Sequence, residues 1–145
     1  MVQECKRKWQ AEENQEISYT ELVEISKKAK PLRCFVHPNH SSFLKPVDMP
    51  SAIQNYCKRT HQYVPEDKSS IIRCIFESLA LTYRNVIDNL NKITGKKINK
   101  LHIVGGGAKN KLLCQFTANA TQIPVIAGPV EATAIGNILI QAIAE

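Results

Sequence analysis

The stretch from Ser69 to Thr94 constrains the fold most strongly, because its apolar residues recur at the spacing of one long amphipathic helix. Gly95 follows and supplies a stop for this helix. A helix with a continuous apolar face needs a broad apolar surface against it, so we expect it to pack across a β-sheet. The stripe consists of Ile72, Phe76, Leu79, Tyr83, Val86, Leu90 and Ile93.

The residues after this helix predict a βαβα unit. Leu101 to Val104 form a short apolar strand, and a second strand runs from Pro124 to Ala127. A helix from about Asn110 to Thr121 lies between the strands, and another begins at Glu131. Strands joined by a helical crossover are parallel, and an unbroken apolar strand is typical of a buried position. We therefore expect an α/β fold with the first of these strands central in the sheet.

The first half of the chain predicts shorter helices. Ser18 followed by Glu21 is a capping box, and the helix that it begins ends before Pro31. Asp48 is placed to begin another helix, and the residues from Val2 to Trp9 have the pattern of a helix end. The segment between these helices is rich in proline and is expected to be irregular.

Composition is typical of a globular protein, with 145 residues, 43% hydrophobic and 22% charged. This length suits one core, so we expect a single domain over residues 1–145. No apolar run approaches the roughly 20 residues that cross a bilayer, and the N-terminus lacks the apolar segment of a secretory signal. Five cysteines, an odd number, argue against a secreted disulfide framework. We expect a cytoplasmic protein with no membrane partner.

A net charge of +6 raises the question of nucleic-acid binding. The lysines gather near predicted helix ends, where positive charge is favourable and well solvated. No aromatic residues alternate with them, as a base-stacking surface would require. We therefore expect no nucleic-acid partner.

The strongest candidate site is the segment LHIVGGGAKN, in which a strand leads into Gly105, Gly106 and Gly107. Glycines at such a turn let a ligand approach the backbone closely, and a helix start offers N–H donors. The alternative is a tight turn that binds nothing. Asn110 is placed either to cap the following helix or to offer its amide to a ligand. The spacing matches neither a dinucleotide fingerprint nor a phosphate loop.

Two cysteine patterns leave alternatives open. The Cys-x-x-His-x-x-His spacing in the irregular segment resembles metal-ligand spacing, and the alternative is a solvated loop. Cys57 and Cys74 lie on successive helices and are either a disulfide pair or reduced core residues. The residues of the zinc hypothesis are Cys34, His37 and His40, with His61 or Cys57 as a fourth ligand.

The segments RCIFESLALTYRNVI, LHIVGGGAKNKLLCQFTANA and GPVEATAIGN, with matches along nearly the whole chain, resemble the carboxy-terminal domain of the FGGY carbohydrate kinase family. The resemblance implies part of a ribonuclease H-like domain of the actin/hexokinase ATPase type, with parallel strands and packed helices. It also implies ATP and Mg²⁺ as cofactors. The implied reaction transfers the γ-phosphoryl group of ATP to the 1-hydroxyl of L-rhamnulose.

By this resemblance, Gly105, Gly106, Gly107 and Asn110 hold the adenosine, and Gln3 matches a nucleotide-contacting glutamine. Thr133 to Asn137 match the segment that links two lobes. The sugar site and the catalytic base belong to an amino-terminal domain that this sequence lacks, so no acid here is assigned as the base or as a metal ligand. We expect the isolated chain to be inactive. The alternative is a non-catalytic remnant or an interaction module.

The final predicted helix carries more apolar residues than one buried stripe requires. Exposed apolar surface promotes self-association. We therefore expect a homo-oligomer or limited solubility. The residues that form this surface are Ala134, Ile135, Ile138 and Leu139.

Overall fold

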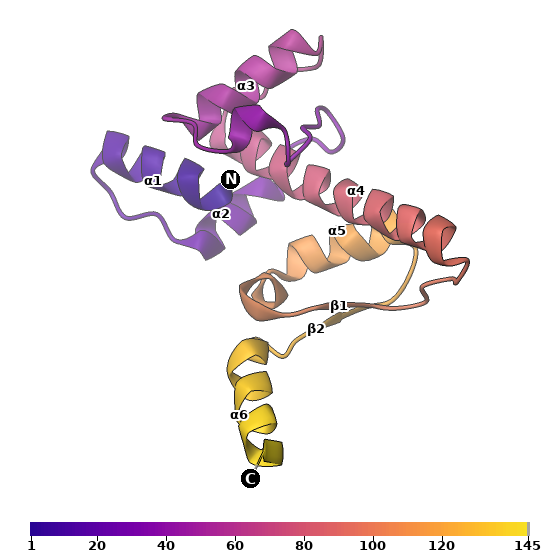
Figure 1. Cartoon of the computed structure of the whole chain (residues 1–145). Coiled ribbons are helices and arrows are strands. Elements are labelled where there is room, and N and C mark those ends of the chain that lie inside the picture. Colours follow the sequence, from indigo (N-terminus) through magenta and orange to yellow (C-terminus); the bar gives the residue numbers. More distant parts are fainter. Residues whose placement is uncertain (145) are drawn as a thin grey trace. The chain divides into compact units, whose positions relative to one another are not determined.

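The computed structural model describes residues 1–144, apart from the side chains of Thr133, Ala142 and Ala144. The chain divides into two compact units, Met1–Thr82 and Tyr83–Glu145. Helix α4 (Lys68–Thr94) is one continuous helix that contributes to both units (Figure 1). The expected long helix is therefore confirmed within one residue of its predicted start.

The first unit is built from helices. Before α4 it contains α1 (Val2–Glu13), α2 (Tyr19–Ser26), the 3₁₀ turn η1 (Ser41–Phe43) and α3 (Met49–Arg59). Both predicted caps are confirmed. Ser18 Oγ accepts a hydrogen bond from the Glu21 N–H at 3.0 Å, and Asp48 Oδ1 accepts one from the Ser51 N–H at 2.8 Å.

The core of the first unit brings apolar side chains from α2, α3 and α4 together. Leu22, Ile53, Ile72 and Ile75 are fully buried, and Phe76 is 1% exposed. Burying one such side chain contributes about 1.5–3 kcal/mol relative to leaving it in water. Ile72 and Phe76 of the predicted α4 stripe are therefore confirmed as core, whereas Leu79 is half-buried.

The irregular segment after α2 is attached to α4 rather than solvated throughout. The Leu32 N–H donates to Glu77 Oε2 at 2.9 Å, and the Val36 N–H donates to Ser78 Oγ at 2.9 Å. Cys34 lies between these two attachment points and is 3% exposed. A solvated loop is therefore the wrong description of this part of the segment.

The second unit contains the predicted strands, β1 (Leu101–Ile103) and β2 (Val125–Ala127). They pair in parallel, with Leu101 opposite Val125 and Ile103 opposite Ala127, as expected. Within the described residues the sheet has these two strands alone, so the expectation of a central strand is wrong. Ile103 is half-buried and His102 is exposed, because successive side chains of a strand point to opposite faces of the sheet.

Two helices complete the second unit, α5 (Lys111–Thr121) and α6 (Ala132–Ala144). Helix α5 connects the strands and packs against β2 (Figure 1). The sheet is therefore covered by α5, although the sequence favoured α4 for this role. Each strand is only three residues long, which is too short to serve as the packing surface of a long helix.

The apolar stripe of α4 is not buried along its whole length. Beyond Tyr83, the residues Val86 and Leu90 are 49% and 43% exposed, and Ile93 is 82% exposed. Ile87 is instead buried, at 7% exposure. The predicted stripe is therefore wrong in the second unit, because the buried face of a helix is set by the surface that it meets.

At the level of fold class, the structure is rich in helices with a small parallel sheet, which agrees with a partial α/β domain. The ribonuclease H-like topology and the single domain remain predictions. Over the residues that the structure describes, no helix combines the length and the apolar content that crossing a membrane requires.

Candidate functional site

The glycine triplet follows β1 directly and forms a 3₁₀ turn, η2 (Gly105–Lys109). Gly105 has a φ of +69°, a left-handed conformation that is strained for residues with a side chain. The sequence predicted a loop that leads straight into α5. The extra 3₁₀ turn instead brings the chain from the end of β1 to the start of α5.

A second glycine turn lies beside the first. The Gly128 N–H donates to the Ile103 carbonyl at 2.8 Å, and the Gly105 N–H donates to the Pro129 carbonyl at 3.2 Å. Gly128 also has a positive φ, of +113°. The two turns therefore meet at the carboxyl edge of the parallel strand pair, which is where ligands bind in open α/β sheets.

The middle glycine of the triplet has open space beside its backbone. Gly106 is exposed, and a Cβ atom built on it would meet no atom within 4 Å. A Cβ on Gly107 would lie 3.4 Å from Ile103 Cγ2, so this glycine lets the turn pack closely on β1. The backbone at Gly106 is thus open to a ligand, while Gly105 and Gly107 shape the turn.

Asn110 lies between η2 and α5 and is 2% exposed. Its Oδ1 accepts a hydrogen bond from the Leu113 N–H at 3.0 Å, so the side chain caps α5. The capping role, one of the two alternatives from the sequence, is therefore present. Contact between Asn110 and a nucleotide remains a prediction.

A hollow of about 160 Å³ lies between α5 and β2. It is smaller than the roughly 300–1,000 Å³ of typical ligand pockets, so it can enclose only part of a nucleotide. Cys114 in its wall lies 4.0 Å from the Gly107 carbonyl oxygen, and burial raises the pKa of this thiol. Cys114 is therefore a packing residue beside the turn. The hollow is lined by Lys111, Cys114, Gln115, Ala118, Val125 and Ala127.

The sequence also predicted functional positions outside the glycine turn, at Gln3 and from Thr133 to Asn137. Gln3 is exposed in the first turn of α1, in the first unit, and its contact with a nucleotide remains a prediction. The segment from Thr133 to Asn137 lies in α6, and the side chain of Thr133 is outside the described residues. Asn137 is exposed.

The histidines of the zinc hypothesis do not gather around Cys34. His37 and His61 are exposed, and His40 Nδ1 accepts a hydrogen bond from the Ser42 N–H at 3.2 Å. Cys34 instead lies beside Cys57 and Cys74, and within the described residues these three form the sole group of three or more side chains that could hold a metal ion. The sequence suggested Cys57 as a partner of Cys34 and, separately, of Cys74, but it did not join all three cysteines, because they are far apart in the chain.

Comparison with known proteins identifies the family. The model of the FGGY family of carbohydrate kinases, C-terminal domain, matches residues 1–145. The chain belongs to this family. The expectation that the sequence resembles FGGY kinases is thereby confirmed over its full length.

Curated relatives of this FGGY chain carry the name rhamnulokinase. The protein of Bacteroides thetaiotaomicron is 48% identical over 142 residues, which cover 98% of this chain and 28% of the relative. Those of Bacillus subtilis and Enterococcus faecalis are 42% and 41% identical, and each match covers 99% of this chain and 29% of the relative. The chain thus spans less than a third of the length of these relatives.

The residues at the glycine turns fit a nucleotide better than they fit a magnesium ion. Gly106 offers open backbone to a ligand, as the FGGY resemblance implies for adenosine. Mg²⁺ takes oxygen ligands and is usually held by carboxylates together with phosphate groups. Among the described residues, carboxylates do not gather in a group of three that could hold a metal ion.

Proposed function

We propose that this chain is the adenosine-binding part of an ATP-dependent kinase for L-rhamnulose. The observation that carries the proposal is the meeting of two glycine turns at the carboxyl edge of β1 and β2, with open backbone at Gly106. The rhamnulokinase name of relatives at 41–48% identity supports the choice of sugar.

In this proposal the residues of the chain bind and orient the nucleotide. The Gly106 backbone lies against the adenosine, and Gly105 and Gly107 keep the turn narrow enough for that approach. Asn110 acts through its cap, which fixes the start of α5 beside the turn. ATP supplies the phosphoryl group when it is bound. The sugar site and the base belong to the part of the relatives that this chain does not cover.

A chimera tests the proposal directly. The matching segment of the Bacteroides thetaiotaomicron rhamnulokinase, at 48% identity, is replaced by this chain. L-rhamnulose phosphorylation is then measured in a coupled assay with ATP and Mg²⁺. We expect the chimera to turn over at roughly 1–100 per second, as kinases do, and the chain alone to show no turnover, since phosphoryl transfer needs base, metal and phosphates held together.

The proposal is tested by the activity of the chimera, by the activity of the chain alone and by a variant of the chimera. A folded chimera that does not phosphorylate L-rhamnulose contradicts the proposal, and so does turnover by the chain alone. In the chimera, the Gly106→Val substitution should raise the KM for ATP and leave the KM for L-rhamnulose nearly unchanged. An equal effect on both substrates would show that the glycine turn has no specific role toward the nucleotide.

A further inference from the structure

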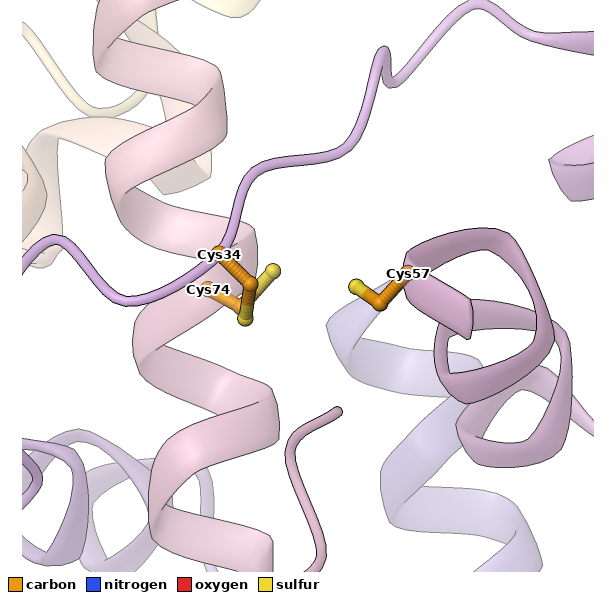
Figure 2. A group of neighbouring side chains, drawn as sticks. All are labelled: Cys34, Cys57 and Cys74. Atoms are coloured by element: carbon orange, nitrogen blue, oxygen red, sulfur yellow. The ribbon is translucent and has the colours of Figure 1, made fainter. Parts of the chain in front are cut away.

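Three cysteines from distant parts of the first unit meet in its core. Cys34 lies in the irregular segment, Cys57 in α3 and Cys74 in α4 (Figure 2). Their Sγ atoms all lie within 4.8 Å of one another. Cys57 is fully buried, and Cys34 and Cys74 are 3% and 2% exposed. Figure 2 shows the Cys57 side chain directed toward the other two.

The backbone around this cysteine cluster is held by hydrogen bonds. Gln62 links Cys57 to the residue that follows Cys34. Its N–H donates to the Cys57 carbonyl at 2.9 Å, and its side chain forms hydrogen bonds with both the N–H and the carbonyl of Phe35. The neighbours of Cys34 are also attached to Glu77 and Ser78 of α4, the helix that carries Cys74. Outer hydrogen bonds of this kind orient the ligands of metal sites.

The spacing of the sulfurs suits coordination of one ion. A thiolate lies about 2.3 Å from zinc, so two sulfurs on one zinc ion are roughly 4 Å apart. The 4.8 Å limit for the cluster requires the sulfurs to move by less than about 1 Å to reach that arrangement. Thiolate sulfur selects soft ions such as Zn²⁺ over Mg²⁺ or Ca²⁺.

The surroundings offer both charge balance and room for a further ligand. A cavity of about 10 Å³ is lined by Cys34 and Cys74, and its volume corresponds to a single water molecule. Three thiolates around a divalent ion carry a net negative charge, which nearby cations stabilise. Three cationic residues and one acidic residue line the cavity, so its side chains carry a net positive charge. They are Lys30, Arg33, Arg73 and Glu77.

We propose that Cys34, Cys57 and Cys74 form a binding site for one thiophilic metal ion of the Zn²⁺ type, with a water molecule from the adjacent cavity as a fourth ligand. The three thiols release their protons to solvent as the metal–sulfur bonds form. The site is separate from the glycine turns and does not depend on nucleotide binding. Its expected role is to tie the irregular segment, α3 and α4 together.

The test uses the whole chain, reduced and stripped of metal. It is titrated with Zn²⁺ and, separately, Cd²⁺, with stoichiometry from native mass spectrometry and affinity from competition with a chelator. X-ray absorption of the zinc-loaded wild-type chain counts the sulfur ligands without any substitution. We expect one ion per chain, bound through three sulfurs.

Matched variants show which cysteine sulfurs bind the metal ion. Cys34→Ser, Cys57→Ser and Cys74→Ser should each weaken Zn²⁺ binding by at least about a hundredfold, because even the loss of a residue that only orients a ligand costs about 10–100-fold. Cys5→Ser is the control, because Cys5 is equally buried but lies outside the cluster, and burial raises its pKa to about 12. Circular dichroism checks that each variant folds.

Several results would overturn the proposal. One is a folded wild-type chain that retains neither ion. Another is equal binding by wild type and the Cys57→Ser variant, and a third is an absorption spectrum without three sulfur neighbours. A disulfide within the cluster that persists under mild reducing conditions would also overturn it, because two of the thiols would then serve as a covalent link. The wild-type spectrum decides the question even where a variant fails to fold.

Discussion

The Gly128 N–H donates to the Ile103 carbonyl oxygen at 2.8 Å, across the gap between the two strand ends. Ile103 is the last residue of β1, and Gly128 follows the last residue of β2. This hydrogen bond continues the parallel pairing by one step and brings the second glycine turn against the first. The candidate nucleotide site is therefore an extension of the sheet.

Gly106→Val should weaken ATP binding without affecting folding. The added side chain meets no atom of the protein within 4 Å, but it fills the space through which a ligand reaches the backbone. We expect the Kd for ATP to rise about tenfold or more, which corresponds to about 1.4 kcal/mol. Isothermal titration calorimetry measures the Kd, and thermal unfolding checks stability.

The control for this substitution is Asn99→Val. Asn99 is exposed and lies before β1, so the same side chain is placed at the opposite end of the strand from the glycine turn. Its Kd for ATP should match that of the wild type. Equal affinities for wild type and Gly106→Val would exclude this backbone from the binding site.

The pH dependence of stability should include a contribution from Asp48. The Ser51 N–H and, less strongly, Lys8 hold the pKa of this carboxyl below its ordinary value of 3.8. A lowered pKa means that the charged form stabilises the fold above that value, and that this contribution is lost as the pH falls through the folded-state pKa. Asp48→Asn keeps a cap but carries no charge.

Urea unfolding at several pH values measures this contribution. At neutral pH the Asp48→Asn variant should be less stable than the wild type by about 0.5 kcal/mol, because it lacks the charge at the start of α3. The difference should shrink below about pH 4 as Asp48 is protonated. A difference that stays constant down to about pH 2 would mean that the charge of Asp48 does not stabilise the fold.

Glu77→Ala should strongly destabilise the first unit. Glu77 is 7% exposed, accepts the Leu32 N–H at 2.9 Å and accepts a hydrogen bond from Arg73 Nε at 2.7 Å. Removing one partner of a buried ion pair costs about 3 kcal/mol. Glu77→Gln keeps an acceptor and should cost less. Urea unfolding at neutral pH measures both changes.

An exposed carboxylate provides the comparison for Glu77. Glu66→Ala should change the free energy of unfolding by less than about 0.5 kcal/mol, as surface substitutions usually do. If Glu77→Ala lies within the same range, the attachment of the irregular segment to α4 is not important for stability.

Helix α6 should promote self-association. Its large apolar residues are 43–80% exposed, more than a stable monomer normally displays on one helix. Sedimentation velocity over a range of micromolar concentrations should show a concentration-dependent rise in mass. The exposed residues are Ile135, Ile138, Leu139, Ile140 and Ile143.

Substitution by lysine distinguishes α6 from other exposed apolar positions. Ile138→Lys should reduce the association, whereas Val47→Lys should not, although Val47 is 98% exposed in the first unit. A wild-type chain that remains monomeric at every concentration would contradict the expectation of a homo-oligomer.

The sequence predicted those features whose physical causes are local. Ser18 and Asp48 begin helices because their side chains accept hydrogen bonds within the next three residues. Gly95 follows α4 with a φ of +65°, which suits a glycine. The glycine turn was likewise identified because a strand, three glycines and a helix are adjacent in the chain.

The features that the sequence did not predict depend on distant residues. The cysteine cluster joins Cys34, Cys57 and Cys74, and no spacing rule connects them. The burial of Ile87 rather than Val86 depends on which surface meets α4 in the second unit. For Asn110, the sequence left two roles open, and the hydrogen bond to the Leu113 N–H established the capping role.

The most direct test of the central claim is an NMR titration of the chain with ATP. The backbone amides of Gly105, Gly106 and Gly107 report on any ligand that contacts the turn. We expect their chemical shifts to move with ATP and with AMP in a saturable manner, since both contain adenosine, and to move little with inorganic triphosphate. Saturable binding of ATP that leaves these three amides unchanged, or no binding at all, would contradict the assignment of the glycine turn as the adenosine site.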